Sequence, residues 1–120
     1  MRSETNRSIQ RLHDIFENID AASEFVDGMT FDAFKTDRLR IYAVTRCLEI
    51  ISEASRRLSD DIKSRNPNIP WPQVASAGNL YRHEYRVVAP AVVWTPLTED
   101  LPALRAVVLQ ELASLTPPAV

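Results

Sequence analysis

The sequence predicts an all-α fold, an up-down bundle of four to five helices, and three observations support this prediction. Apolar residues recur at steps of three and four over long stretches, which is the spacing of one face of an α-helix. All eight prolines follow residue 66, so the first half of the chain is free to form long helices. The chain also lacks the alternation of apolar and polar residues that is typical of half-buried strands.

Two long helices and a short turn are expected in the first half. The first helix covers about residues 4–27, with Ser3 or Thr5 as its cap and Gly28 as its stop signal. Its apolar stripe consists of Ile9, Leu12, Ile15, Phe16, Ile19, Ala22, Phe25 and Val26. A short capped turn follows at residues 30–34, and Thr36 or Asp37 caps the second long helix. The apolar face of this second helix consists of Leu39, Ala43, Cys47, Ile50, Ile51, Ala54 and Leu58.

Caps and prolines divide the second half into shorter helices. Ser59 opens a short helix that ends near Arg65, and Pro70 or Pro72 suits the first turn of a helix over about residues 71–83. A further helix opens at Pro90, and Pro96 ends or kinks it. The last helix starts at Thr98 or Asp100, with Pro102 in its first turn, and reaches about residue 114. We therefore expect a single helical domain over residues 1–115 and a flexible tail over residues 116–120.

Composition and motifs exclude several classes of function. A net charge of -2 argues against bulk attraction to nucleic acid, although twelve of the fourteen basic residues are arginine, which suits bidentate phosphate contacts. The chain has no apolar run long enough for a membrane span and no apolar core of a signal peptide, so we expect a cytoplasmic location. Nucleotide-binding glycine motifs, a nucleophile elbow and metal-ligand spacings are absent. No metal or other cofactor is therefore expected, and we expect Cys47 to be buried and His13 to be exposed.

The stretch from Asn79 to Tyr85 gathers an amide, an imidazole and a phenol within seven residues. In a helix, Asn79 and His83 are four residues apart and share a face. An imidazole that titrates near neutrality can act as a general base, for example on the 2′-hydroxyl of RNA. Such cleavage also needs a cation to stabilise the developing phosphorane charge, and Arg82 and Arg86 are near in sequence. A lone histidine is nevertheless a weak signal of catalysis.

Two further patterns each leave two interpretations open. Tyr42, Arg46, Glu49 and Glu53 form a polar row on the second long helix. This row is either a solvated stripe of ion pairs or one wall of a groove that faces residues 79–85, with Arg46 and Glu53 lining it. The apolar segment 87–94 is either a buried short helix or an oligomer interface.

Several blocks, in their order and spacing, resemble the HepT-like branch of the HEPN superfamily over roughly residues 8–110. These blocks are Phe25–Phe34, Ala43–Ala54, Ile69-Pro70-Trp71, Asn79–Tyr85, Val93-Trp94 and Asp100–Leu104. The resemblance implies an all-α homodimer that acts as a toxin, a metal-independent ribonuclease with tRNA or mRNA as substrate. It also implies that a minimal nucleotidyltransferase antitoxin is the partner.

The resemblance assigns roles to individual residues. His83 matches the catalytic histidine, and Asn79 matches the polar residue that follows the family's arginine. Tyr85 matches the tyrosine to which the partner attaches AMP, although it is otherwise readable as a plain interfacial phenol. Arg46 and Glu53 match positions on the neighbouring helix.

One departure from the family pattern concerns the catalytic arginine. The arginine expected five residues before the histidine falls on Gly78, and the other allowed positions are Ala77 and Ser76. A milder departure is Ser52, where the family usually has glycine. Loss of one electrostatic contact of this kind typically costs about 10²–10³ in rate. Three outcomes remain: an arginine from another position (82, 86 or 46) supplies the charge, the chain binds RNA or nucleotide without cutting it, or it acts as a scaffold for its partners.

Overall fold

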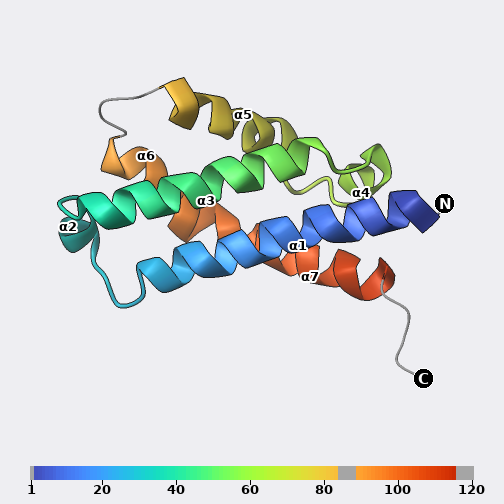
Figure 1. The fold of residues 1–120 in the computed structure, drawn as a ribbon, viewed down its shortest axis with the longest axis horizontal. Helices are drawn as coiled ribbons and strands as arrows, with labels where there is room; N and C mark the ends of the chain where they lie inside the picture. The colour runs from blue at the N-terminus through green and yellow to red at the C-terminus, as the bar shows by residue number, and fades with distance from the viewer. Residues whose placement is uncertain (1, 84–88, 116–120) are drawn as a thin grey trace.

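The computed structural model describes the backbone of residues 2–83 and 89–115, and the side chains of residues 4–77 and 89–115. Four long helices form the body of the fold: α1 (Arg2–Phe25), α3 (Arg38–Arg56), α5 (Trp71–His83) and α7 (Leu101–Leu115). They alternate in direction along the chain (Figure 1). The predicted all-α class and up-down arrangement are therefore confirmed. The tail at residues 116–120 and the C-terminal part of the stretch 79–85 lie outside the described residues.

Helix α1 starts at Arg2, so the predicted caps Ser3 and Thr5 lie inside it and that prediction was wrong. The next three helices start at residues that the sequence marked as caps. The hydroxyl of Thr30 accepts a hydrogen bond from the backbone N–H of Ala33 at 3.2 Å and begins α2 (Phe31–Phe34). Asp37 does the same for α3, where it accepts from the backbone of Arg40 at 3.1 Å. Ser59 caps α4 (Asp60–Arg65). A helix leaves its first N–H groups without partners, and Ser, Thr and Asp side chains can accept from them. These residue types therefore mark helix starts in the sequence.

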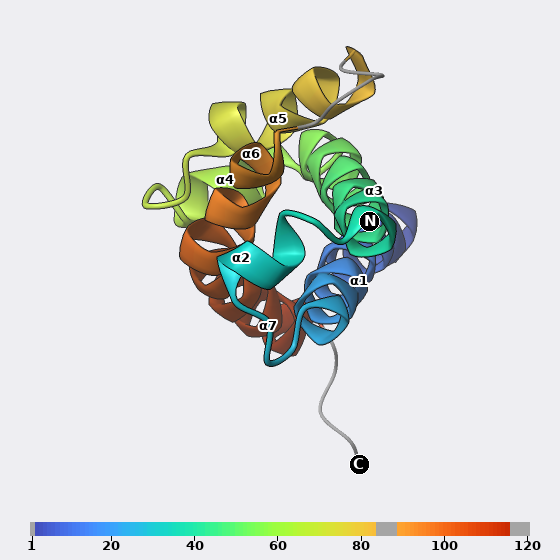
Figure 2. The same ribbon diagram turned by 90° about the vertical axis from the view of Figure 1, so that its left-hand side faces the viewer.

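The core lies between α1, α3 and α7. It includes Leu12, Ile15 and Ile19 of α1, Val44 and Ile51 of α3, and Leu104 and Val108 of α7, all nearly inaccessible to solvent. Figure 2 shows α2 lying across one end of the bundle. There the fully buried ring of Phe34 packs against Trp94 at a centroid distance of 4.9 Å, and Phe31 meets the same ring edge-on at 5.9 Å. These two phenylalanines therefore join α2 to the segment that carries Trp94.

The chain from residue 90 to residue 115 winds continuously, with no break at Pro96. Helix α6 (Pro90–Thr95) passes into a π-helical segment, η1 (Pro96–Asp100), which passes into α7. The backbone N–H of Leu101 donates to the carbonyl of Pro96, five residues back. Pro102 follows directly and has no N–H to donate, which interrupts the regular α-helical hydrogen bonds. The π-helical turn, which is wider than an α-helical turn, lies next to this interruption.

Burial agrees with most sequence predictions and corrects two of them. Phe25 was assigned to the apolar stripe of the first helix, but it is the last residue of α1 and 41% of it is exposed. Cys47 is buried, which raises the pKa of its thiol, and His13 is exposed, both as expected. Leu39, however, was assigned to the apolar face of the second helix, and 74% of it is exposed. It lies in the first turn of α3 between two exposed arginines, where no neighbouring helix covers it.

Candidate functional site

Helix α5 carries the candidate catalytic positions, and it spans the predicted residues 71–83. Its interior side is marked by Val74 and Ala77, which are partly buried against the core. Pro72 and Ser76 are exposed and mark the opposite side. With 3.6 residues per turn, positions 79 and 83 continue the exposed stripe of positions 72 and 76. The helix register therefore predicts that positions 79 and 83, one turn apart, share this stripe.

The side chains at positions 78–83 lie outside the described part of the chain, and so do all atoms of residues 84–88. This range includes the predicted Asn79, Arg82, His83, Tyr85 and Arg86. Their roles therefore stay predictions, which rest on the register of α5 and on the family pattern.

The two candidate residues on α3, Arg46 and Glu53, are described in full. The Arg46 side chain is 69% exposed, and its guanidinium lies 3.8 Å from the carboxylate of Glu49. Glu53 is within 3.1 Å of Arg57 and lines a hollow between α3 and α1. In contrast, α3 presents Leu48, Ile51 and Ser52 to the region of α5. Within one chain, Arg46 and Glu53 thus lie on a side of α3 that does not face α5.

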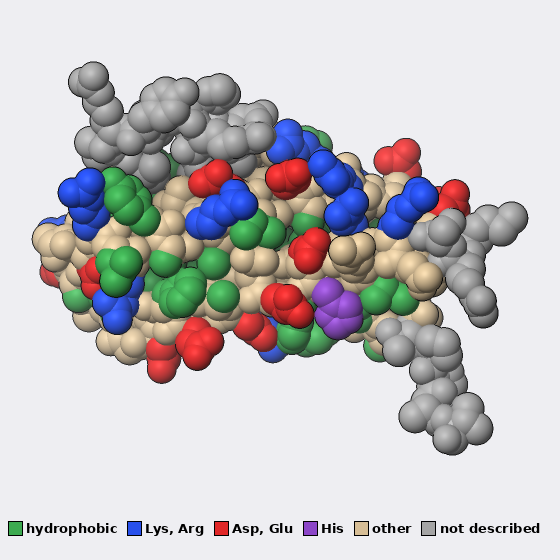
Figure 3. Space-filling view, in the orientation of Figure 1, with side chains coloured by type: hydrophobic (Ala, Val, Ile, Leu, Met, Phe, Trp, Pro, Cys, Tyr) green, Lys and Arg blue, Asp and Glu red, His purple; other side chains and the backbone are tan. Residues whose placement is uncertain are grey.

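Figure 3 shows that basic and acidic side chains are interspersed on this face of the molecule. Ion pairs within single helices account for much of the pattern, including those of Arg46, Arg57 and Lys35. Exposed pairs of this kind contribute little to stability. The described part of the polar row on α3 therefore has the character of a solvated ion-pair stripe.

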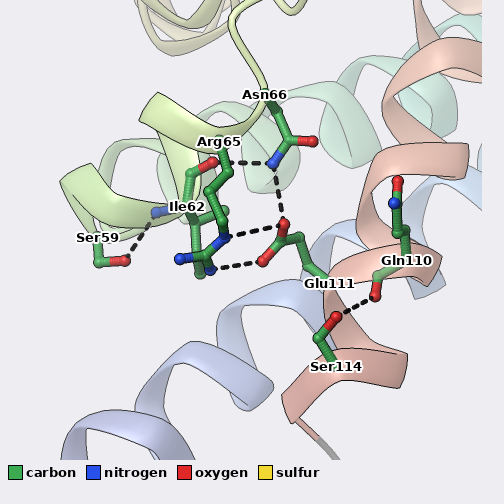
Figure 4. Close-up of polar contacts among 7 residues, drawn as sticks. All are labelled: Ser59, Ile62, Arg65, Asn66, Gln110, Glu111 and Ser114. Atoms are coloured by element: carbon green, nitrogen blue, oxygen red, sulfur yellow. Dashed lines mark hydrogen bonds and ion pairs between the residues drawn. The ribbon is translucent and has the colours of Figure 1, made fainter.

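The N-terminal end of α5 is held by a polar cluster that the sequence did not predict (Figure 4). Glu111 of α7 is buried, with 8% of its side chain exposed. Its carboxylate accepts hydrogen bonds from Arg65 at 2.7 and 3.4 Å and from the amide of Asn66 at 3.1 Å. The same amide donates to the carbonyl of Ile62 at 2.9 Å. The cluster thus joins α4 and the loop after it to the last helix.

The loop residue Asn66 also forms a hydrogen bond with the first residue of α5. Its carbonyl accepts a hydrogen bond from the indole N–H of Trp71, the first residue of α5, at 3.0 Å. The Trp71 ring is itself 8% exposed and packs in the core. Trp71 therefore anchors the start of α5 in the core.

Electrostatics favour the charged form of both partners in the cluster. The hydrogen bond from Arg65 lowers the pKa of Glu111, and a further bond from Asn66 acts in the same direction against the effect of burial. The hydrogen bond to Glu111 raises the pKa of Arg65. One signal in the sequence pointed here, since Glu111 is the only acidic residue of α7, a helix of otherwise largely apolar composition.

Two classes of site find no support in the described residues. Within them, no cluster of His, Cys, Asp and Glu side chains has an arrangement that could bind a metal ion. None of the helices in the same part of the chain combines the length and the apolar character that crossing a bilayer requires.

The described residues define the class of the fold: an all-helical domain whose four long helices alternate in direction (Figure 1). The model of the family "Ribonuclease HepT-like" matches residues 15–111. The chain therefore belongs to the HepT-like ribonuclease family.

Relatives with assigned names are similar over most of the chain. A protein of Thermococcus cleftensis with the name "Probable ribonuclease HepT" is 38% identical over 94 residues, which are 78% of this chain and 86% of that protein. A protein of Methanocaldococcus jannaschii with the name "Putative RNase MJ1380" is 33% identical over 94 residues. These residues are again 78% of this chain and 86% of that protein. No solved structure matches the chain.

Proposed function

We propose that the chain is a toxin-module protein with the architecture of a metal-independent HEPN ribonuclease, with His83 and Asn79 at its catalytic centre. The observation that carries this proposal is that a HepT-like chain has a continuous helix α5 with positions 79 and 83 one turn apart on its outward stripe. His83 accepts the proton of the attacking 2′-hydroxyl, and Asn79 orients the phosphate.

Cleavage by this centre is weak or lost because Gly78 stands at the arginine position. A glycine has no charge to place beside the phosphorane, and one such contact is typically worth about 10²–10³ in rate. Arg82, Arg86 and Arg46 are the candidates to supply the charge or to hold RNA. Because Arg46 faces away from α5 in its own chain, it reaches a centre only across a dimer interface.

In this proposal the protein is a homodimer, because the stripe of positions 72, 76, 79 and 83 on α5 is expected to lie at the surface of the single chain. Residues 79 and 83 on an outward face bind RNA in a cleft only if another surface closes it, and a second copy supplies that surface. Exposed apolar side chains near the N-terminal end of α3 and on α6 offer contact area: Leu39, Tyr42 and Val92. In this proposal the dimer works in the cytoplasm, and a minimal nucleotidyltransferase antitoxin silences it by placing AMP on Tyr85.

The proposal is tested by incubating the purified protein with tRNA and with mRNA in the presence of EDTA. We expect slow cleavage or none from the native chain, an increase of up to about 10²–10³ from Gly78→Arg, and loss of that gain in Gly78→Arg/His83→Ala. His13→Ala is the matched control, because His13 is an exposed histidine of α1. Cleavage that survives His83→Ala would refute the assignment of the base. Robust native cleavage that His83→Ala abolishes would refute only the role given to Gly78.

The alternative is a non-catalytic helical dimer that binds RNA, a nucleotide or the antitoxin, and the absence of an arginine at position 78 favours it. Co-expression with a minimal nucleotidyltransferase, followed by incubation with ATP and intact mass measurement, tests the partner. The expected product carries AMP on Tyr85 and the Tyr85→Phe variant carries none. A stable complex without any RNA cleavage by Gly78→Arg would favour this alternative, whereas the absence of both complex and adduct would remove it.

A further inference from the structure

A cavity of about 250 Å³ lies beside α5, on the side away from the stripe of positions 79 and 83. Its walls come from α3, α5, η1 and α7. They are mostly apolar and include Leu48, Ile51, Val74, Ala77, Leu101 and Leu104. At about 30 Å³ per water molecule, this volume equals that of about eight waters, which is enough for a ligand with a single aromatic ring. Apolar cavities with a few convergent polar groups are the usual form of small-molecule sites.

Ser52 supplies an unpaired polar group in this cavity. The residue is 2% exposed and lines the cavity wall, yet among the described residues its hydroxyl has no hydrogen-bond partner. Two neighbours behave differently: the hydroxyl of Thr45 donates to the carbonyl of Ile41 at 2.7 Å, and that of Ser55 donates to the carbonyl of Ser52 at 2.7 Å. A serine in a helix ordinarily makes such a bond to its own backbone. The free Ser52 hydroxyl is therefore available to a ligand in the cavity.

The charged residues in the described part of the cavity lining are all acidic. Glu99 and Asp100 of η1 are exposed, and no described residue forms an ion pair with either of them. Among the described residues of the lining, none is Lys, Arg or His. Both carboxylates belong to the π-helical segment, a form of backbone that is frequent at functional sites. The free carboxylates favour a cation over an anion at this cavity.

We propose that this cavity binds a small organic amine with an apolar, ring-sized body. The body lies against the apolar walls, a hydrogen-bonding group of the ligand meets the Ser52 hydroxyl, and the ammonium group lies near Glu99 and Asp100. Each part of the proposal uses a different observation: the volume and wall chemistry, the unpaired hydroxyl of a largely buried serine, and two unpaired acids. The site is distinct from the proposed cleavage centre, since it occupies the opposite side of α5, and it does not depend on the proposed ribonuclease activity.

Four probes that differ by one group test the proposal by titration of the ¹⁵N-labelled full chain in two-dimensional NMR. Tyramine has both polar ends, phenethylamine lacks the hydroxyl, tyrosol has a hydroxyl in place of the amine, and 4-hydroxyphenylacetate has an anion there. We expect tyramine to bind with a dissociation constant on the order of 1 mM or below and to shift the amides of the cavity lining. Tyrosol is expected to bind about three- to tenfold more weakly, and the anion more weakly still.

Three variants assign the contacts, and all are conservative enough to keep the fold. In Glu99→Gln/Asp100→Asn, tyramine and tyrosol should bind equally, and in Ser52→Ala, tyramine and phenethylamine should bind equally. Glu17→Gln, on the exposed side of α1, is the matched control and should change nothing. Equal binding of tyramine and tyrosol to the native chain would overturn the proposal. So would shifts confined to residues outside the cavity, or no shifts up to about 10 mM, ten times the expected constant.

Discussion

The two ends of helix α5 differ in what holds them. At the N-terminal end, the buried Trp71 indole donates to Asn66, and Asn66 is in turn bound by the buried Glu111 of α7. Farther along, the exposed stripe of Pro72 and Ser76 leads to positions 79 and 83, with only one side of the helix against the core. The comparison teaches that the chain fixes the start of α5 through a polar cluster remote from the candidate positions, whereas farther along the described contacts of the helix are apolar packing on one side.

Trp71→Ala should have the largest effect on stability of the variants at the N-terminal end of α5. We expect a loss of about 3–5 kcal/mol in the free energy of unfolding, because a large buried ring is replaced by a cavity and Asn66 loses its indole donor. Urea unfolding followed by circular dichroism measures it. Trp71→Phe is the control: it keeps most of the ring and should cost about 1 kcal/mol for the missing N–H. An equal loss in both variants would show that the hydrogen bond, and not the packing, holds this end.

Glu111→Gln comes next, with an expected loss of about 1–3 kcal/mol, because the hydrogen bonds of Arg65 and Asn66 lose their charged acceptor. The pH dependence has a definite sign. The folded state lowers the pKa of Glu111, so its stabilisation is complete above the ordinary value of 4.5 and is lost as the pH falls below it. Unfolding free energies measured from about pH 6 down to about pH 3 should therefore fall less steeply in the variant. Parallel curves would contradict this role of Glu111.

Gly78→Ala tests the part of α5 beyond its N-terminal end. Unlike the two variants above, it is expected to raise the free energy of unfolding. Gly78 lies inside α5, and a glycine in a helix interior costs about 0.5–1 kcal/mol relative to alanine. The variant should be more stable by this amount in urea unfolding. A loss of stability would instead indicate that a neighbouring backbone or a second copy approaches position 78 closely. Comparison of dilute and concentrated samples would separate these two causes.

Asp20→Asn should have the smallest effect, and it serves as a reference pair that does not touch α5. Asp20 of α1 accepts from Arg105 of α7 at 2.7 Å, the same distance as in the Arg65–Glu111 pair. Its side chain is 44% exposed, against 8% for Glu111, so water screens the interaction. We expect a loss of about 0.2–1 kcal/mol that decreases in high salt. A loss as large as that of Glu111→Gln would show that burial is not what distinguishes the two pairs.

Much of the fold could be predicted because its signals are local. Thr30, Asp37 and Ser59 cap their helices through side-chain hydrogen bonds within three residues, and the stripe of α1 follows from spacing alone. Leu39 was misassigned because spacing shows which residues share a face and does not show where a neighbouring helix ends. The Glu111 cluster was missed because its partners are separated by forty-five residues or more in sequence.

In the candidate site, too, the local features could be predicted from the sequence and the long-range ones could not. The pairing of positions 79 and 83 follows from local helix geometry, and α5 has the extent that this requires. Whether Arg46 and Glu53 share a groove with them depends on how α3 is rotated against its neighbours, which no local pattern encodes. The unpaired hydroxyl of Ser52 was equally hidden, since only tertiary packing decides whether a helical serine meets its own backbone or a cavity.

The π-helical segment sets the rotational phase of everything after it. Val93 and Leu97 before the junction, and Leu101, Leu104 and Val108 after it, all lie in the core. Successive steps of four residues in a regular α-helix would rotate this row gradually around the axis, and the wider turn takes up that rotation. The hydrogen bond that closes this turn spans five residues instead of four, so the segment holds one residue more than a regular α-helical turn would. This wider turn sets the phase of α7 that brings Glu111 to Arg65 and Arg105 to Asp20.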